Sequence, residues 1–292
     1  MRKKVILIFL SVATLFVFAV CGAEEKREEI PVSFASEDGW QIKGKYLNPV
    51  QGNYVLVYIH SQKKNSSEWN KALWLAKKYG YGYLAFDLRG HGESIVSPSG
   101  SSVTYRSFNI AGQDNEYNKM IRDMEGAISF LNSQSISNDR LVLIGSVLGA
   151  NLAIKSAAIH KDIPMLITVT PVLNVNDVLS VNPLRAYGER PMLLISASNR
   201  ARQYMEFQIL NDMAKSYSGR RNVAVIVGAT GFGVSILTGQ ILRRMFAWIK
   251  NPAMPQEVER STQTAAPTPP YGGGQAETET QGIPEIPYEE DE

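Results

Sequence analysis

A short run in the middle of the chain has the layout of a turn that presents a catalytic nucleophile. Residues 141–153, LVLIGSVLGANLA, begin as an apolar strand and continue into a helix-forming stretch. In the Gly-x-Ser-x-Gly pattern of such a turn, the serine stands between two glycines at a sharp strand-to-helix bend. Here the glycines are Gly145 and Gly149, and the central residue is Val147. The sequence therefore predicts this turn with no heteroatom at its centre.

Ser146 is the obvious substitute for the missing nucleophile. A pattern centred on Ser146 would need small residues at the positions that hold Ile144 and Leu148. We therefore expect the Ser146 side chain to point away from any site at this turn. A serine would also need a base, because a hydroxyl is a poor nucleophile near neutral pH.

The three histidines of the chain each have a simpler interpretation than catalysis. His60 ends an apolar strand, and His91 shares the loop DLRGHGES with Asp87 and Arg89. A structural role is expected for these residues, because in the protein family that this loop resembles it usually braces its own backbone. His160 follows a predicted helix and is expected to lie in solvent. His60, Asp87 and His91 could share a metal ion if their strands are neighbours. Their spacing does not require this, and we predict no metal site and no cofactor.

The elements around these residues predict an α/β fold with a mostly parallel sheet covered by helices on both faces. Residues 31–48 alternate apolar and polar types around Asp38-Gly39, which predicts an opening antiparallel hairpin. Chemistry in such sheets gathers where the parallel strands end. Further strands are expected at 54–59, 82–86, 141–144, 165–170, 192–196 and 223–227, and helices at 69–79, 115–132, 150–159, 204–217 and 235–249.

This order of elements, together with DLRGHGES after one strand and IGSVLGANLA after the next, resembles the α/β-hydrolase family over roughly residues 30–250. Many members insert a helical lid where this chain has only the short segment 172–191. The chain therefore resembles the compact, lidless members, such as dienelactone-hydrolase-like proteins and small esterases or serine peptidases.

The resemblance implies a catalytic serine, acid and histidine in that chain order. The first implied position is Val147, the second is Asn199 or Arg200, and the third is Gly231 or Phe232. No acidic residue lies in 190–205, and no histidine follows residue 160. We therefore predict a degenerate triad and no catalytic residue at these positions.

The resemblance also implies two backbone donors, the N–H groups of Leu148 and of a residue near Ser61. Such donors at a helix N-terminus favour anions. We predict that Ser61, Val147, Leu148 and Phe232 form a pocket that binds a small carboxylate or ester, or an envelope protein, without hydrolysis. One alternative is an active esterase or peptidase that uses other residues. Another is a structural envelope protein whose pocket is filled by Val147 and Phe232.

The first 23 residues resemble a secretory signal, because Arg2, Lys3 and Lys4 precede the apolar run 5–20. The chain's single cysteine, Cys21, follows that run where a bacterial lipoprotein carries its lipid. We predict an exported protein held at the cell envelope by lipidated Cys21. Ordinary cleavage after Ala23 and an uncleaved anchor remain open, although the run is shorter than the ~20 residues that span a bilayer.

Residues 252–292 are predicted to be a disordered acidic tail, because they hold seven of the 14 prolines and few large apolar residues. Nine acids against Arg260 give this tail a net charge of −8. The whole chain carries +2 and the signal +3, so the body, residues 24–251, carries about +7. That charge is too mild and too scattered to indicate nucleic-acid binding.

Overall fold

The computed structural model describes residues 27–112 and 114–252. The predicted signal, Cys21 and all but the first residue of the predicted tail lie outside these residues. No helix within them is both long and apolar enough to cross a membrane.

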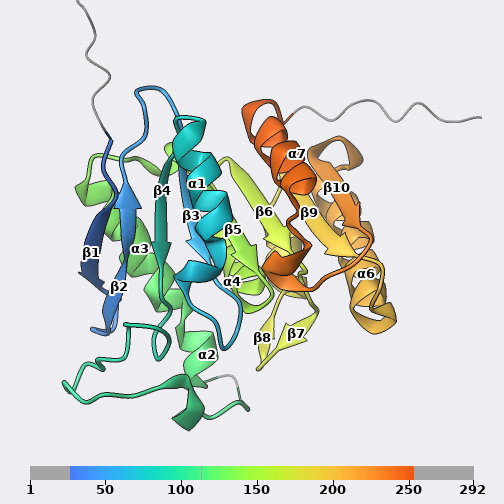
Figure 1. Cartoon of the computed structure of the whole chain (residues 1–292). Coiled ribbons are helices and arrows are strands. Elements are labelled where there is room, and N and C mark those ends of the chain that lie inside the picture. Colours follow the sequence, from blue (N-terminus) through green and yellow to red (C-terminus); the bar gives the residue numbers. More distant parts are fainter. Residues whose placement is uncertain (1–26, 113, 253–292) are drawn as a thin grey trace, which may run out of the picture. The chain divides into compact units, whose positions relative to one another are not determined.

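Within the described residues, eight strands form one sheet (Figure 1). From edge to edge they are β1 (Ile30–Ala35), β2 (Gln41–Leu47), β4 (Gly82–Phe86), β3 (Val55–Ile59), β5 (Leu141–Ser146), β6 (Met165–Val169), β9 (Met192–Ala197) and β10 (Val223–Gly228). The pairs from β4 to β10 are parallel, whereas β1–β2 and β2–β4 are antiparallel. The predicted α/β fold with an opening hairpin is confirmed.

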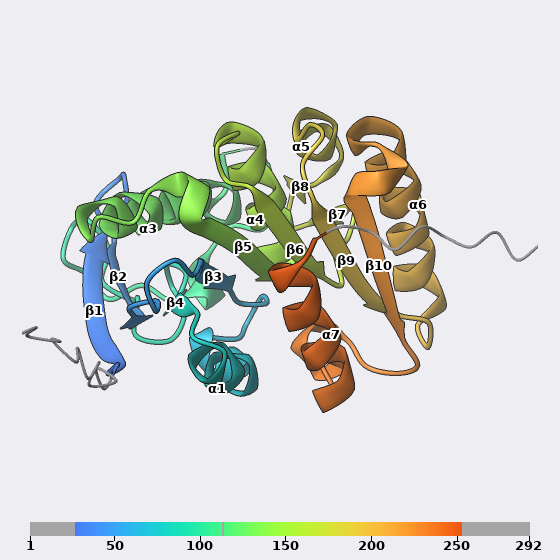
Figure 2. The same cartoon turned by 90° about the horizontal axis from the view of Figure 1, so that it is seen from above.

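Helices cover both faces of this sheet (Figure 2). One face carries α3 (Ile121–Ser133), α4 (Leu148–Ile159), α5 (Val181–Ala186) and α6 (Ala201–Ser218). The other face carries α1 (Asn70–Lys78) and α7 (Gly239–Lys250). Because the parallel strands are buried on both sides, β3, β4, β5 and β6 consist of buried residues throughout.

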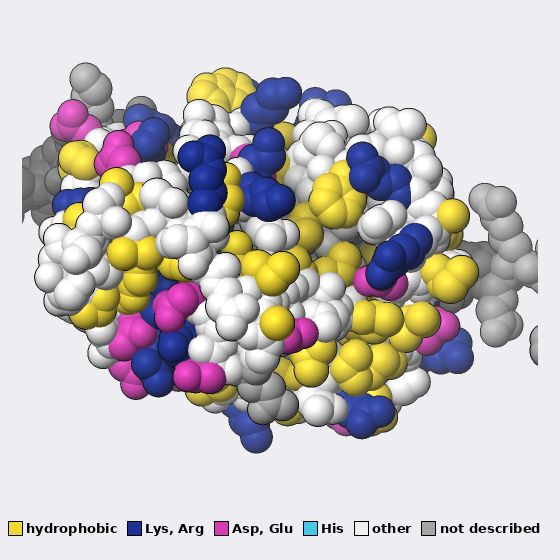
Figure 3. Space-filling model, turned by 90° about the horizontal axis from the view of Figure 1, so that it is seen from below, with side chains coloured by type: hydrophobic (Ala, Val, Ile, Leu, Met, Phe, Trp, Pro, Cys, Tyr) yellow, Lys and Arg dark blue, Asp and Glu magenta, His cyan; other side chains and the backbone are white. Residues whose placement is uncertain are grey.

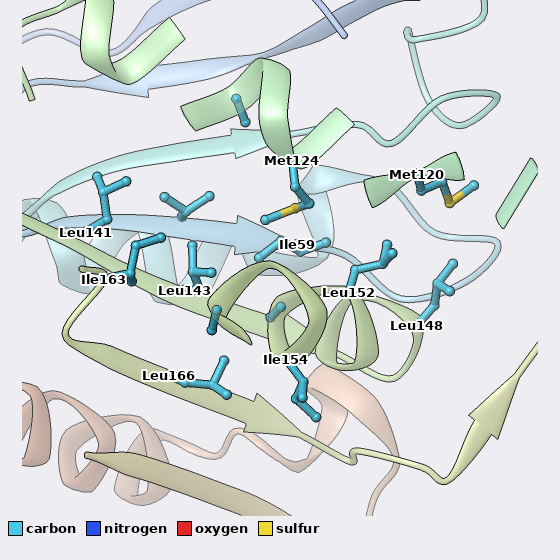
Figure 4. Close-up of a cluster of buried hydrophobic side chains, with 14 of the residues drawn as sticks. Ile59, Met120, Met124, Leu141, Leu143, Leu148, Leu152, Ile154, Ile163 and Leu166 are labelled. Carbon is cyan, nitrogen blue, oxygen red and sulfur yellow. The ribbon is translucent and has the colours of Figure 1, made fainter. Parts of the chain in front are cut away.

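Each face of the sheet packs its own hydrophobic cluster. On one side, Leu143 of β5 and Ile59 of β3 pack with Leu148 and Leu152 of α4 and Met124 of α3 (Figure 4). All five side chains are inaccessible to solvent. Fully burying a leucine side chain stabilises a fold by roughly 1.5–3 kcal/mol. This packing fixes the start of α4, and with it the turn at Val147, relative to the sheet.

Three features of the fold differ from the sequence predictions. The helix expected at 115–132 is two helices, α2 (Glu116–Lys119) and α3, because the backbone tightens at Met120, whose N–H bonds the carbonyl of Tyr117 three residues earlier. Segment 172–191 holds a small hairpin, β7 (Asn174–Val175) and β8 (Val178–Leu179), followed by α5. Finally, a 3-10 turn at Gly233–Ile236 precedes α7.

Candidate functional site

The predicted turn between β5 and α4 is formed, with Val147 at its centre. Val147 has φ 52° and ψ −105°, and α4 begins at the next residue. A Cβ on Gly145 would lie 2.0 Å from the Gly149 carbonyl oxygen, and one on Gly149 would lie 2.2 Å from that of Ile59. Both glycines are therefore required by close backbone contacts rather than by positive φ.

The backbone around Val147 holds this residue in a left-handed conformation. Its N–H donates to the Val169 carbonyl at 3.0 Å, and its own carbonyl accepts from Ala150 at 3.1 Å. A β-branched residue with positive φ is unusual, and such a conformation costs on the order of 1–3 kcal/mol. The side chain is 7% exposed and lines a pocket. Val147 thus stands where the turn would present a nucleophile.

Ser146 lies one residue away but does not reach the pocket. Its side chain is fully buried, and its hydroxyl accepts a hydrogen bond at 2.8 Å from the hydroxyl of Ser61, which lines the pocket. Gly233 covers this pair, because a Cβ there would lie 3.1 Å from Ser146 Oγ and 3.2 Å from Ser61 Oγ. The Ser146 hydroxyl therefore lies behind Ser61 and is separated from the pocket by Ser61 and Gly233.

One of the two backbone donors expected to bind an anion is already occupied. The Ser61 N–H donates to Glu68 Oε1 at 2.5 Å. Glu68 belongs to the 3-10 helix Ser66–Trp69, which folds back over the end of β3, and burial raises the pKa of its carboxyl group. The expectation of a vacant donor at Ser61 is corrected, because a carboxylate of the chain itself fills it.

Leu148 contributes to the site only through its backbone. Its side chain is fully buried in the hydrophobic cluster on this face of the sheet (Figure 4). It does not line the pocket. As the first residue of α4, its N–H has no acceptor within the helix. The prediction of Leu148 as a ligand-binding residue is therefore limited to that donor.

The residues at the implied acid and histidine positions follow β9 and β10. Arg200 lines the pocket, and its guanidinium lies 5.0 Å from the ring centre of Phe232, which lines the pocket as well. Asn199 and Gly231 are not among the lining residues. A Cβ on Gly231 would lie 3.0 Å from the backbone of Ile236. At the implied acid position, Arg200 rather than Asn199 shares the pocket with Val147. At the implied histidine position, Phe232 rather than Gly231 does so.

These residues surround a pocket of about 850 Å³ at the ends of the parallel strands. Figure 3 looks onto this edge of the molecule and shows hydrophobic side chains between scattered Lys and Arg side chains. Val147 and Phe232 line the pocket with Val172 and Val175, and they do not fill it. The alternative of a pocket closed by Val147 and Phe232 is therefore wrong.

Charged side chains line the pocket beside its apolar residues. The cations are Lys64, Lys71, Arg200 and Arg202, and the carboxylates are Glu68 and Glu206. Both carboxylates are engaged: Glu68 accepts from the Ser61 N–H, and Glu206 accepts from the Leu173 N–H at 3.1 Å. The pocket therefore offers more positive than negative charge to a ligand.

His60 and His91 have structural contacts, in agreement with the sequence prediction. His60 Nδ1 donates to the Ser61 carbonyl at 2.8 Å, and its Nε2 accepts from the Leu88 N–H at 2.9 Å. His91 Nδ1 donates to the Arg89 carbonyl at 2.9 Å. Burial, together with the neighbouring His91, lowers the pKa of His60 to about 4. His60 is therefore a neutral residue that holds two loops.

The other residues of the DLRGHGES loop also brace the backbone. Asp87 accepts hydrogen bonds from the Ser66 N–H at 2.7 Å and the Glu93 N–H at 2.9 Å. Arg89 is fully buried and pairs with Asp123, also fully buried, at 2.7 Å. Among the described residues, no cluster of three or more histidine, cysteine or acidic side chains could hold a metal ion.

The sequence predicts that His160 lies in solvent, but in the structure it pairs with an acidic side chain. Its Nε2 lies 2.8 Å from a carboxylate oxygen of Glu125 on α3, and this hydrogen bond raises the pKa of His160. The sequence does not show this pairing because the partner lies on another helix. His160 ends α4 at the opposite end from Val147, so it takes no part in the site.

The sequence predictions assign no role to Glu68, and they place Thr170 at a strand end without a role. Glu68 follows a polar loop without a pattern that would link it to Ser61. Thr170, at the end of β6, has φ 52°, and its hydroxyl accepts from the Gly233 N–H at 3.0 Å. Thr170 thereby holds the loop after β10 over the turn at Val147.

Comparison with known proteins agrees with this architecture. Residues 53–254 match the family model described as serine aminopeptidase, S33. An esterase of Pyrococcus furiosus is 18% identical with a TM-score of 0.59, and the match covers 77% of this chain and 92% of that one. A dienelactone hydrolase of Anabaena variabilis is 12% identical with a TM-score of 0.58, covering 77% of this chain and 96% of that one.

A further relative is similar to this chain over a shorter stretch. The uncharacterized protein YfhR of Salmonella typhi is 24% identical over 127 residues, which are 41% of this chain and 37% of that protein. The match thus spans little more than a third of that relative's length. The family model, by contrast, covers well over half of the chain. The chain belongs to the serine aminopeptidase S33 family and has the α/β-hydrolase fold.

Proposed function

We propose that this protein is an exported, membrane-tethered ligand-binding protein that keeps the hydrolase fold without serine-hydrolase activity. The observation that carries this proposal is Val147 at the centre of the turn, where a valine can neither attack a carbonyl nor be activated by a base. Arg200 and Phe232 line the pocket at the implied acid and histidine positions. Neither can orient a histidine as an acid does or act as a general base.

The lining of the pocket favours a ligand with an apolar part and an anionic head. Val147, Val172 and Phe232 offer an apolar surface, and Lys64 and Arg200 offer positive charge beside it. The Leu148 N–H at the start of α4 adds a donor with the positive end of a helix dipole behind it. A short-chain carboxylate combines both properties, and an ester of that acid is the neutral counterpart.

Calorimetry on the purified full chain tests the binding proposal. We expect saturable binding of a short-chain carboxylate such as hexanoate, weakened about tenfold or more by Arg200→Gln and by Phe232→Ala. Arg185→Gln is the matched control, because Arg185 is an exposed arginine on α5 that does not line the pocket. Absence of binding by hexanoate and by its ethyl ester would contradict the proposal.

An active esterase remains the second candidate, because one observation favours it. The Ser61 hydroxyl lines the pocket, and the neighbouring Glu68 carboxyl group has a pKa raised by burial, so a serine and a potential base lie together. Ser61 Oγ, however, donates its hydrogen bond to Ser146 rather than lying free. Labelling by a serine-reactive probe, with Ser61→Ala as its control, separates the two candidates.

Membrane attachment depends on residues outside the described part of the chain. The charged start and apolar run of residues 1–20, followed by Cys21, support export with lipid attachment at that cysteine. We expect Cys21→Ser to abolish labelling by a fatty-acid analogue and to move the protein out of the detergent phase. Unchanged partitioning would favour an uncleaved anchor, and a soluble wild-type protein would favour cleavage after Ala23.

A further inference from the structure

Helices α1 and α7 lie side by side on one face of the sheet and carry charge of one sign (Figures 1 and 2). They are joined by the ring contact of Tyr79 with Phe246, whose centres are 5.2 Å apart. Neither helix contains an acidic residue. Their six basic residues, all exposed, are Lys71, Lys77, Lys78, Arg243, Arg244 and Lys250. We call this surface the α1–α7 face.

The α1–α7 face also exposes aromatic side chains. Trp74 is 64% exposed, whereas the other three tryptophans, Trp40, Trp69 and Trp248, are 6%, 0% and 8% exposed. Lys78 Nζ lies 5.3 Å from the Trp74 ring centre, and Tyr79, just after α1, is 42% exposed. Beside Trp74, α1 and α7 enclose a groove of about 650 Å³. An exposed patch of aromatic side chains beside a groove indicates a surface that contacts another molecule.

The described chain starts at this same face. The Arg27 guanidinium donates to the carbonyls of Lys77 at 2.5 Å and Tyr81 at 2.9 Å. The Arg27 side chain therefore ties the start of the described chain to the end of α1. Residue 27 follows Cys21 by six positions, and six extended residues span at most about 20 Å. A lipid on Cys21 would hold Arg27 within that distance of the bilayer and would thereby bring the end of α1 close to it.

We propose that the α1–α7 face lies on an anionic membrane surface. Six cations without an acid between them complement anionic headgroups, and tryptophan with tyrosine suits the boundary between headgroups and acyl chains. A second copy of the same face is disfavoured, because it would bring six cations against six. This inference rests on the membrane attachment in the proposed function, and it is independent of ligand binding at Val147.

Fluorescence of the full chain in vesicles tests the inference, because Trp74 is the exposed tryptophan. The probe is phosphatidylcholine with about one third phosphatidylglycerol, in which brominated acyl chains quench tryptophan at the membrane boundary. We expect quenching of the wild-type chain that Trp74→Phe removes. Quenching should be several-fold weaker when the vesicles contain phosphatidylcholine alone. It should be weaker by a similar factor for the triple variant Lys77→Gln, Lys78→Gln and Arg243→Gln in the anionic vesicles.

A charge-matched variant serves as the control for the triple change. Lys63→Gln, Arg106→Gln and Arg185→Gln remove three exposed cations that lie outside α1 and α7, and should leave the quenching unchanged. Flotation of the same samples reports attachment separately. Chain that floats with vesicles but shows no quenching of Trp74 would overturn the inference while leaving the tether intact.

Two further results would also overturn the inference. Chain that does not float with anionic vesicles would contradict both the tether and the face. Failure of acrylamide to quench Trp74 in the absence of vesicles would mean that protein, rather than lipid, covers the face.

Discussion

The carboxylate of Glu68 accepts a hydrogen bond from the backbone N–H of Ser61 at 2.5 Å, at the edge of the pocket that Val147 lines. The family resemblance implies that this N–H faces the substrate oxygen in an active member. Here a negative side chain holds it instead. The relationship agrees with the proposed loss of catalysis, since a turn with Val147 at its centre forms no oxyanion that this N–H would stabilise.

Removal of the Glu68 carboxylate should tighten the binding of an anionic ligand. We expect Glu68→Ala to bind hexanoate about tenfold more tightly at pH 7, because a competing charge leaves and the Ser61 N–H becomes available. Glu206→Ala is the matched control, because it removes the same charge from the pocket without freeing Ser61. Equal gains in both variants, measured by calorimetry, would assign the effect to net charge and contradict a role for the Ser61 donor.

The conformation of Val147 predicts an unusual response to glycine. We expect Val147→Gly to stabilise the fold by up to about 1 kcal/mol, because glycine reaches positive φ without strain, and lost packing offsets the rest. Val142→Gly is the control, since Val142 is fully buried in β5, the strand that leads into the turn, and its loss should cost several kcal/mol. Urea unfolding measures both free energies. A comparable loss in the two variants would mean that Val147 is unstrained.

Burial of neutral His60 predicts a loss of stability in acid. Its pKa is about 4 in the fold against 6.5 for the free side chain, so the unfolded chain binds the proton first as pH falls. The contribution of neutral His60 to the unfolding free energy is complete above pH 6.5. It is on the order of 3 kcal/mol and is lost as the pH falls from 6.5 to 4. We expect His60→Gln to flatten the pH dependence of the unfolding free energy over this window.

His160→Gln provides the opposite control for that measurement. The hydrogen bond with Glu125 raises the pKa of His160, so its contribution is present in acid and is lost as pH rises through the raised pKa. The pair is partly exposed, and its contribution is expected to stay below ~1 kcal/mol.

The unfolding curves of the wild-type chain would contradict the assignment of His60 if stability stayed constant from pH 6.5 to 4.

Much of the fold could be predicted from local patterns. The apolar runs at β3, β5 and β9 and the Asp38-Gly39 turn each carry their own signal, and a valine between Gly145 and Gly149 still predicts the turn because both glycines are needed for close packing. Contacts between distant residues carried no such signal. Ser61 with Glu68, and Thr170 with Gly233, are set by how loops fold over the sheet edge.

Repair of the turn alone should not create an enzyme. We expect Val147→Ser to hydrolyse a nitrophenyl ester at no more than a trace rate, because no histidine lines the pocket and its two carboxylates, Glu68 and Glu206, are held by backbone N–H groups. The smallest repair with a physical basis adds Phe232→His and an acid at 199 or 200. Arg200→Asp is the preferred choice, since Arg200 lines the pocket and Asn199 does not. Ordinary enzymatic turnover by Val147→Ser alone would show that a residue of the pocket, such as Glu68, acts as the base and would contradict the loss of catalysis.

Reaction of the purified full chain with a fluorophosphonate probe measures serine-hydrolase competence most directly. Such probes form a covalent bond only with an activated serine, and Val147 leaves none at the turn. We predict no labelling of the wild-type chain under conditions that label an active esterase completely. Stoichiometric labelling that Ser61→Ala or Ser146→Ala abolishes would contradict the loss of catalysis and would identify the nucleophile.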